Sequence, residues 1–167
     1  RSISSWTLAG RAKRMVGGNV YEVVSLEREP DLKLDGLSLW ALAREFPDSD
    51  DYWDGNWLHI HAVVEAPGGR VETTVPWRRT ADIARFASQL LTLDEELSGN
   101  AQLQCIEPML QVELACKALG RIAVEISITP DHMTQSHRFS FFIDQTYLDP
   151  LSRACARMLD RFPIKGT

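Results

Sequence analysis

The chain has 167 residues, of which 44% are hydrophobic and 25% charged, the ordinary composition of a single globular domain. Its formal net charge is -5, with 18 basic and 23 acidic side chains. Such a balance argues against nucleic acid as the partner, because phosphate binding normally requires a basic patch, and no apolar run is long enough to span a bilayer.

The N-terminal part of the chain carries the weakest patterns. Residues 1–20 contain three glycines and a basic cluster without a sustained period, and they predict a loosely ordered arm. Residues 21–167 are then expected to form a single α+β domain. An alternating pattern predicts an edge strand over residues 21–29, ended by Pro30, and a second strand over residues 37–42.

A β-hairpin is the clearest element of the sequence. Residues 58–64 and 71–77 alternate between apolar and polar side chains on either side of Pro67, Gly68 and Gly69. Thr80 then stands where a helix N-cap is expected, and Gly99 follows the helix. The apolar stripe of this helix is expected to comprise Ile83, Phe86, Ala87, Leu90, Leu91 and Leu97.

Strand patterns return after this helix. They cover residues 101–107, 109–118, 121–129 and 138–144, and the second and third of these face each other in the register of a hairpin. A last helix is predicted from Pro150 until Pro163 ends it. Strand runs separated by single helices, summarised as the order β-β-β-α-β-β-β-α, predict an α+β fold: an antiparallel sheet of about 6–7 strands with two main helices packed on one face.

The three cysteines indicate free thiols. Cys105, Cys116 and Cys155 share no CxxC spacing, and each falls at an apolar position of a predicted strand or helix. Buried free thiols fit a reducing compartment, so the sequence predicts a cytoplasmic protein.

The most informative segment is the turn that precedes the first strand of the hairpin. Within it acidic side chains alternate with aromatic rings: Asp48, Asp50, Asp51, Tyr52, Trp53 and Asp54. Carboxylates steer a cationic partner, and rings supply contact area at low entropic cost, so these six residues are the predicted protein-binding site. The alternative is a structural turn, in which the aspartates bond local amides and the tryptophans anchor the turn.

Two other interpretations of the site remain open. His59 and His61 lie two residues apart on a predicted strand and could line a small-ligand or metal site with the acidic turn, joined by His132 or His137. The domain could also be a homodimeric scaffold that pairs exposed sheet edges. The sequence shows no GxSxG, P-loop, GxGxxG or HExxH motif, so we expect neither an enzyme nor a bound cofactor or metal.

Three segments taken together resemble the WapI-like family, immunity proteins linked to wall-associated contact-dependent toxins. They are the turn at residues 51–58, the helix at residues 83–90 and the run at residues 139–148. The likeness extends over residues 37–162. It implies a non-enzymatic cytoplasmic protein that binds and blocks the toxic domain of a contact-delivered polypeptide. In the founding case that domain resembles a tRNA-cleaving nuclease.

Overall fold

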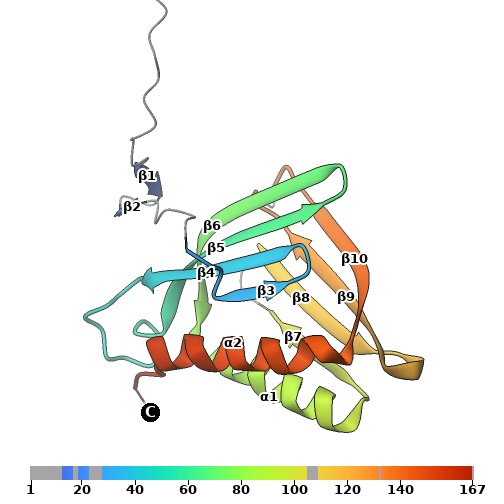
Figure 1. The fold of residues 1–167 in the computed structure, drawn as a ribbon. Helices are drawn as coiled ribbons and strands as arrows, with labels where there is room; N and C mark the ends of the chain where they lie inside the picture. The colour runs from blue at the N-terminus through green and yellow to red at the C-terminus, as the bar shows by residue number, and fades with distance from the viewer. Residues whose placement is uncertain (1–12, 17–18, 23–27, 105–108, 132, 167) are drawn as a thin grey trace, which may run out of the picture.

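The structure, a computed structural model, describes residues 13–16, 19–22, 28–104, 109–131 and 133–166 (Figure 1). Cys105 and His132 lie outside the described residues, as does the segment 23–27 of the edge strand expected at residues 21–29. Side chains are described from residue 28 onward, apart from those of residues 75–78 and of the undescribed positions.

Eight of the strands form two antiparallel sheets of four strands each. The first sheet has the order β3-β4-β5-β6, with strands Leu32–Leu34, Leu37–Arg44, Trp57–Ala66 and Gly69–Arg79. The second has the order β10-β9-β8-β7, with strands Asn100–Leu103, Leu110–Cys116, Arg121–Ile128 and His137–Asp144 numbered from β7 to β10. In both sheets, neighbours in the sequence are neighbours in space, so each is a simple meander.

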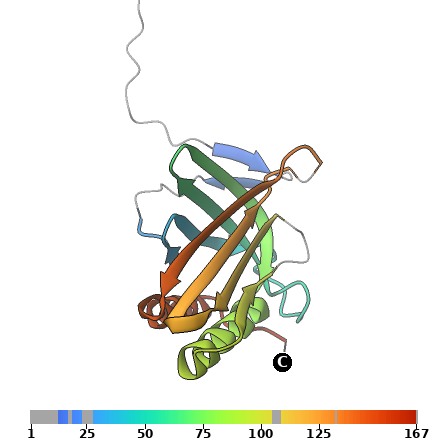
Figure 2. The same ribbon diagram turned by 90° about the vertical axis from the view of Figure 1, so that its right-hand side faces the viewer.

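A helix follows each sheet in the chain. Helix α1 covers Thr80–Glu96 after β6, and α2 covers Leu148–Arg161 after β10, with short 3-10 turns at Ala118–Gly120 and Gln145–Tyr147. The two helices lie side by side across the same end of both sheets (Figures 1 and 2). Residues 32–161 therefore form two successive units of the same order, a four-stranded meander and then a helix.

A small ribbon lies within and just beyond the expected N-terminal arm. Strands β1 (Lys13–Val16) and β2 (Asn19–Glu22) pair antiparallel with each other and with no other described strand. The ribbon spans the boundary expected at residue 20.

One apolar core joins both sheets and both helices. Strands β3–β5 and β7–β10 contribute alternate residues to it, as the period of two requires. On β4 and β5 these are Leu37, Leu39, Ala41, Leu58, Ile60, Ala62 and Val64, each at most 1% exposed. On β8 and β9, the inward residues Leu114 and Val124 are direct partners, which confirms the hairpin register expected from the sequence.

The α+β class and the antiparallel pairing are confirmed, but the single sheet is a wrong prediction. The strands divide at α1 into two sheets, and the helices cover one end shared by both sheets instead of one face of a single sheet. Strand alternation indicates only that one face of each strand is buried. It does not say whether a helix or a second sheet buries that face, and here the two apolar inner faces share one core.

Helix α1 also differs from its expected pattern at three positions. Leu91 is 53% exposed and Leu97 is 44% exposed, whereas Leu93 is 1% exposed and belongs to the core. Thr80 is the first helical residue, and Arg79 holds the N-cap position with extended backbone angles. The Thr80 hydroxyl instead donates a 2.7 Å hydrogen bond to Oδ1 of Asn56, outside the helix.

Helix α2 is fastened to the first sheet by a carboxylate between two arginines. Asp31 accepts a pair of hydrogen bonds from Arg28, at 3.0 and 2.9 Å, and a second pair from Arg161, both at 2.8 Å. It also accepts a 2.7 Å bond from the Ala41 amide of β4. Burial by itself raises the pKa of Asp31, but the hydrogen bonds from Arg28, Arg161 and Ala41 outweigh it and hold that pKa below its usual value.

Candidate partner-binding surface

The acidic and aromatic segment forms the connection between β4 and β5, seen at the left of Figure 1 beside the C-terminal segment. Asp51 organises it, because its Oδ1 accepts hydrogen bonds from the amides of Trp53, at 2.7 Å, and Asp54, at 3.1 Å. Its carbonyl accepts a further bond of 2.8 Å from Gly55. An aspartate that bonds the amides two and three residues ahead is a turn-forming device, so Asp51 serves the shape of the segment.

Asn56 closes the turn from within the protein. Its side chain is fully buried, and its Nδ2 donates to the carbonyls of Tyr52 at 2.8 Å and Lys165 at 2.9 Å. Its Oδ1 accepts from the Lys165 amide at 2.9 Å and from the Thr80 hydroxyl at 2.7 Å. Two donors and two acceptor lone pairs are the full capacity of a carboxamide. Asn56 therefore joins the turn, the start of α1 and the C-terminal segment at one point.

The C-terminal segment holds the turn from the other side. The Lys165 ammonium donates to the carbonyls of Pro47 and Ser49, both at 2.8 Å, and lies 3.2 Å from Oδ1 of Asp50. Arg44 of β4 adds hydrogen bonds to the carbonyls of Gly55 and Pro163. The turn is thus fixed by cations that bind its backbone oxygens.

Two glycines permit the close approach of these segments. A Cβ atom at Gly55 would lie 2.5 Å from the Ser49 carbonyl oxygen, and one at Gly166 would lie 2.4 Å from the Tyr52 amide nitrogen. Gly166 also has a φ of +68°, in the left-handed region that favours glycine. Neither position can carry a side chain without displacement of the turn.

Aromatic side chains project outward from this fixed backbone. Trp53 is 61% exposed, Phe46 45% and Tyr52 36%. The Tyr52 and Trp53 rings meet edge to face at 5.5 Å, and the Arg79 guanidinium lies 5.0 Å from the Trp53 ring centroid. These contacts hold the indole in place while most of its surface stays open to solvent. Trp53 is therefore not the buried anchor that the structural interpretation of the turn expected.

The surface carries charges of both signs. Asp48, Asp50, Asp51 and Asp54 are all exposed, while Arg44, Arg79 and Lys165 lie among them in the contacts just described. Burial and the nearby charge of Asp54 raise the pKa of Glu45, the residue that follows β4. We define the exposed side chains of Phe46, Asp48, Asp50, Tyr52, Trp53 and Asp54 as the acidic-aromatic surface.

The structure brings all six predicted site residues together, which their closeness in the sequence made easy to predict. It separates Asp51, whose carboxylate is engaged with the backbone, from the others, whose side chains point outward. The six predicted site residues did not include Phe46, Asn56, Arg79 or Lys165. Phe46 adjoins the segment and could have been included, but nothing local in the sequence links Lys165 to Asn56, which lies 109 residues earlier.

The alternative ligand or metal site was expected at His59 and His61. His59 and His61 do share a face of β5, the one that points away from the core. His59 is 4% exposed, and burial lowers its pKa. His61 lies 5.5 Å from Trp40, ring to ring, with its Nδ1 2.6 Å from the Thr74 hydroxyl. Within the described ranges, no three or more His, Cys, Asp or Glu side chains gather as they would around a metal ion.

Taken together, the fold and this surface define an α+β protein of two antiparallel meanders that presents exposed aromatic and acidic side chains on a fixed turn. Its chain matches the family described as the Immunity protein WapI-like family over residues 31–163, most of its length, and the protein belongs to that family. No curated protein and no solved structure matches the chain. None of the helices in the described part of the chain combines the length and the apolar character needed to cross a membrane.

Proposed function

We propose that the protein is a non-enzymatic inhibitor that binds the toxic domain of a polypeptide and neutralises it by occlusion, with the acidic-aromatic surface as its contact region. Family membership supports the immunity role. The observation that supports this particular surface is the exposed indole of Trp53, 61% accessible, on a turn whose backbone is fixed from three directions.

The energetic argument concerns pre-organisation. A partner that binds a mobile loop must offset the entropy of ordering it, about 0.5–1.5 kcal/mol for each immobilised side chain. Here Asn56 and Lys165 have already ordered the turn during folding. Tryptophan and tyrosine are the residue types that most often dominate binding energy at protein interfaces.

The charges of the surface indicate the partner's chemistry. Asp48 and Asp54 are exposed, and neither side chain has an ion pair among the described residues. They are available to a basic partner surface, such as the substrate-binding face of a nuclease, and complementary charge accelerates association with such a partner. We therefore propose a basic toxic domain, of nuclease type, as the target.

The test captures the partner from the native host by affinity purification, and then measures its affinity by calorimetry and the protection against it by growth. Trp53→Ala should weaken binding by about 2 kcal/mol or more, roughly thirtyfold, as expected for a central aromatic contact. Leu91→Ala is the matched control, because Leu91 is also an exposed large apolar residue but lies on α1.

The charge arm of the test replaces Asp48 and Asp54 by lysine and leaves Asp51 intact, since Asp51 shapes the turn. The double variant should slow association, and Glu95→Lys/Glu96→Lys on α1 should not, although it changes the net charge equally. Full affinity and full protection in Trp53→Ala and in the double aspartate variant would rule out this surface as the contact region.

A further inference from the structure

The outer face of the second sheet brings two like charges together. Glu113 on β8 and Glu125 on β9 are direct cross-strand partners, and both are exposed. Like charges in directly opposite positions destabilise a sheet. Arg138 lies 3.6 Å from Glu125, but these side chains are 67% and 48% exposed, and such an ion pair contributes little. For Glu113, the part of the chain that the structure describes provides no ion pair.

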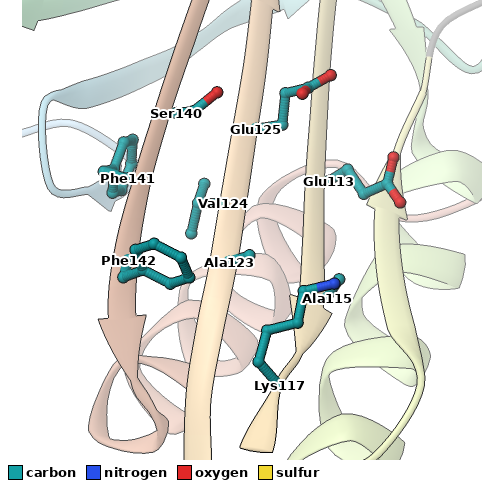
Figure 3. A pocket seen from close by; sticks show the side chains of 9 residues that line it. All are labelled: Glu113, Ala115, Lys117, Ala123, Val124, Glu125, Ser140, Phe141 and Phe142. Atoms are coloured by element: carbon teal, nitrogen blue, oxygen red, sulfur yellow. The ribbon is translucent and has the colours of Figure 1, made fainter.

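A hollow of about 330 Å³ lies beside the two carboxylates (Figure 3). Ala115 and Ala123, a direct cross-strand pair, form its floor, and Phe142 stands next to Ala123 on the neighbouring strand β10. The Phe142 ring is 57% exposed and lies 4.1 Å from the Arg121 guanidinium. The alanines and the ring make an apolar strip, and the two glutamates project beside it (Figure 3).

The hairpin that joins β8 to β9 carries an unusual leucine. Leu119 is 98% exposed and has a φ of +64°, a backbone conformation that L-residues other than asparagine and aspartate adopt rarely. In the free protein it gains nothing from packing and adds strain. Strained, exposed apolar residues concentrate at binding sites, where a partner can cover them.

We propose that this hollow receives an arginine side chain from a protein partner. Its aliphatic stem would lie on Ala115, Ala123 and Phe142, and its guanidinium between Glu113 and Glu125. A guanidinium has five N–H donors in a planar fork, so one group can bond both carboxylates and remove their repulsion. The inference rests on the proposed function in taking a protein as the partner, but it concerns a different face of the molecule.

The rim of the hollow favours a single basic side chain over a polycation. Lys117 lines the same hollow close to Ala115 (Figure 3), and Arg138 lies beside Glu125. Together with Arg121, which lies against the Phe142 ring, these cations confine the negative charge to the space between Glu113 and Glu125. A partner with one arginine on an extended segment fits that distribution, whereas a chain of amines would meet Lys117 and Arg138.

The experiment is a titration of the full chain, labelled at alanine methyl groups, with the tripeptide acetyl-Gly-Arg-Gly-amide, followed by NMR. The Ala115 and Ala123 methyl signals should shift and saturate. The same peptide with citrulline in place of arginine keeps the shape and removes the charge. It should bind at least about tenfold more weakly, because charge-assisted hydrogen bonds are roughly twice as strong as neutral ones. Spermidine should not reproduce the shifts at equal concentration.

Variants connect the response to the glutamates. Glu113→Gln/Glu125→Gln should abolish the shifts, and Glu95→Gln/Glu96→Gln, which removes the same charge from exposed positions of α1, should retain them. Equal binding of the citrulline peptide or of spermidine, or shifts unchanged in Glu113→Gln/Glu125→Gln, would overturn the inference. Shifts confined to residues around Trp53 would overturn it as well, yet leave the proposed function standing.

Discussion

Asn56 and Lys165 exchange two hydrogen bonds, each 2.9 Å long, in which the carboxamide of one residue pairs with the backbone of the other. The two residues are 109 positions apart in the chain, and their contact fixes the turn that carries the acidic-aromatic surface to the C-terminal segment. Substitutions at Asn56 and Gly166 test the strength of that attachment.

Asn56→Asp should destabilise the protein by about 3 kcal/mol. The substitution keeps the shape of the side chain but replaces the two N–H donors with an oxygen that faces the carbonyls of Tyr52 and Lys165, and an unsatisfied buried group costs about 1–3 kcal/mol. Urea denaturation measures the change. Asn100→Asp, the same chemical change at an exposed position of β7, should stay within about 0.5 kcal/mol, and equal losses in both variants would contradict the prediction.

Gly166→Ala should release the C-terminal segment from the turn. Its added Cβ would lie 2.4 Å from the Tyr52 amide nitrogen, in addition to the strain of a positive φ. Gly68→Ala provides the matched control, because Gly68 has a φ of +84° but no atom within 4 Å of the added Cβ. Both variants should lose about 1 kcal/mol from backbone strain, and only Gly166→Ala should lose more.

The readout for this pair is thermal unfolding together with amide exchange at Trp53. Faster exchange at Trp53 is expected in Gly166→Ala alone. Identical unfolding curves for the two alanine variants would show that the close approach of Gly166 to Tyr52 contributes nothing to stability.

Asp31 should give the protein an acid-sensitive stability. Because the folded pKa of this carboxyl lies below its ordinary value of 3.8, the folded state binds the proton less readily than the unfolded chain does. The stabilisation is therefore complete above pH 3.8 and is lost as the pH falls below 3.8 through the folded pKa. Asp31→Asn should cost about 2–3 kcal/mol at pH 7, since both charged pairs of hydrogen bonds weaken.

Urea denaturation of wild type and Asp31→Asn, from pH 7 downward, checks this expectation. The stability difference between the two proteins should shrink as the pH approaches and passes below 3.8. Asp160→Asn, at an exposed position of α2, serves as the control. A difference that stays constant down to the acid unfolding transition would exclude Asp31 as a source of pH dependence.

Leu119→Asn should stabilise the protein by about 0.5–1 kcal/mol. Asparagine tolerates a φ of +64° better than leucine does, and a side chain that is 98% exposed gives up no packing. Leu97 also has a positive φ, of 48°, but is only 44% exposed, so Leu97→Asn loses apolar contact and should gain less. A destabilised Leu119→Asn variant, measured by thermal unfolding, would refute the interpretation of Leu119 as strained.

The elements of the fold were predictable wherever the signal was local. The hairpin of β5 and β6 and the pairing of Leu114 with Val124 follow from alternation and turn residues alone. The division into two sheets was not predictable, because alternation leaves the identity of the covering layer open. The buried stripe of helix α1 was predicted only in part, because Leu93 and not Leu91 faces the core.

The candidate site divides in the same way. Its exposed members are neighbours in the sequence, so composition revealed them. The turn that holds them depends on hydrogen bonds between Asn56 and Lys165, which are 109 residues apart in the chain. The pairing of Glu113 with Glu125 depends on the register between β8 and β9. The hollow beside these glutamates depends on the pairing of β9 with β10 as well.

The junction at Asn56 makes the turn part of the protein's global folding unit. Its four hydrogen bonds reach Tyr52 in the turn, Thr80 at the start of α1 and Lys165 after α2, so the turn cannot open without disturbing the attachment of both helices. Local opening there should consequently require a large share of the free energy of unfolding. A partner that binds at Trp53, as we propose, would therefore contact the global folding unit of the protein and not a separately mobile loop.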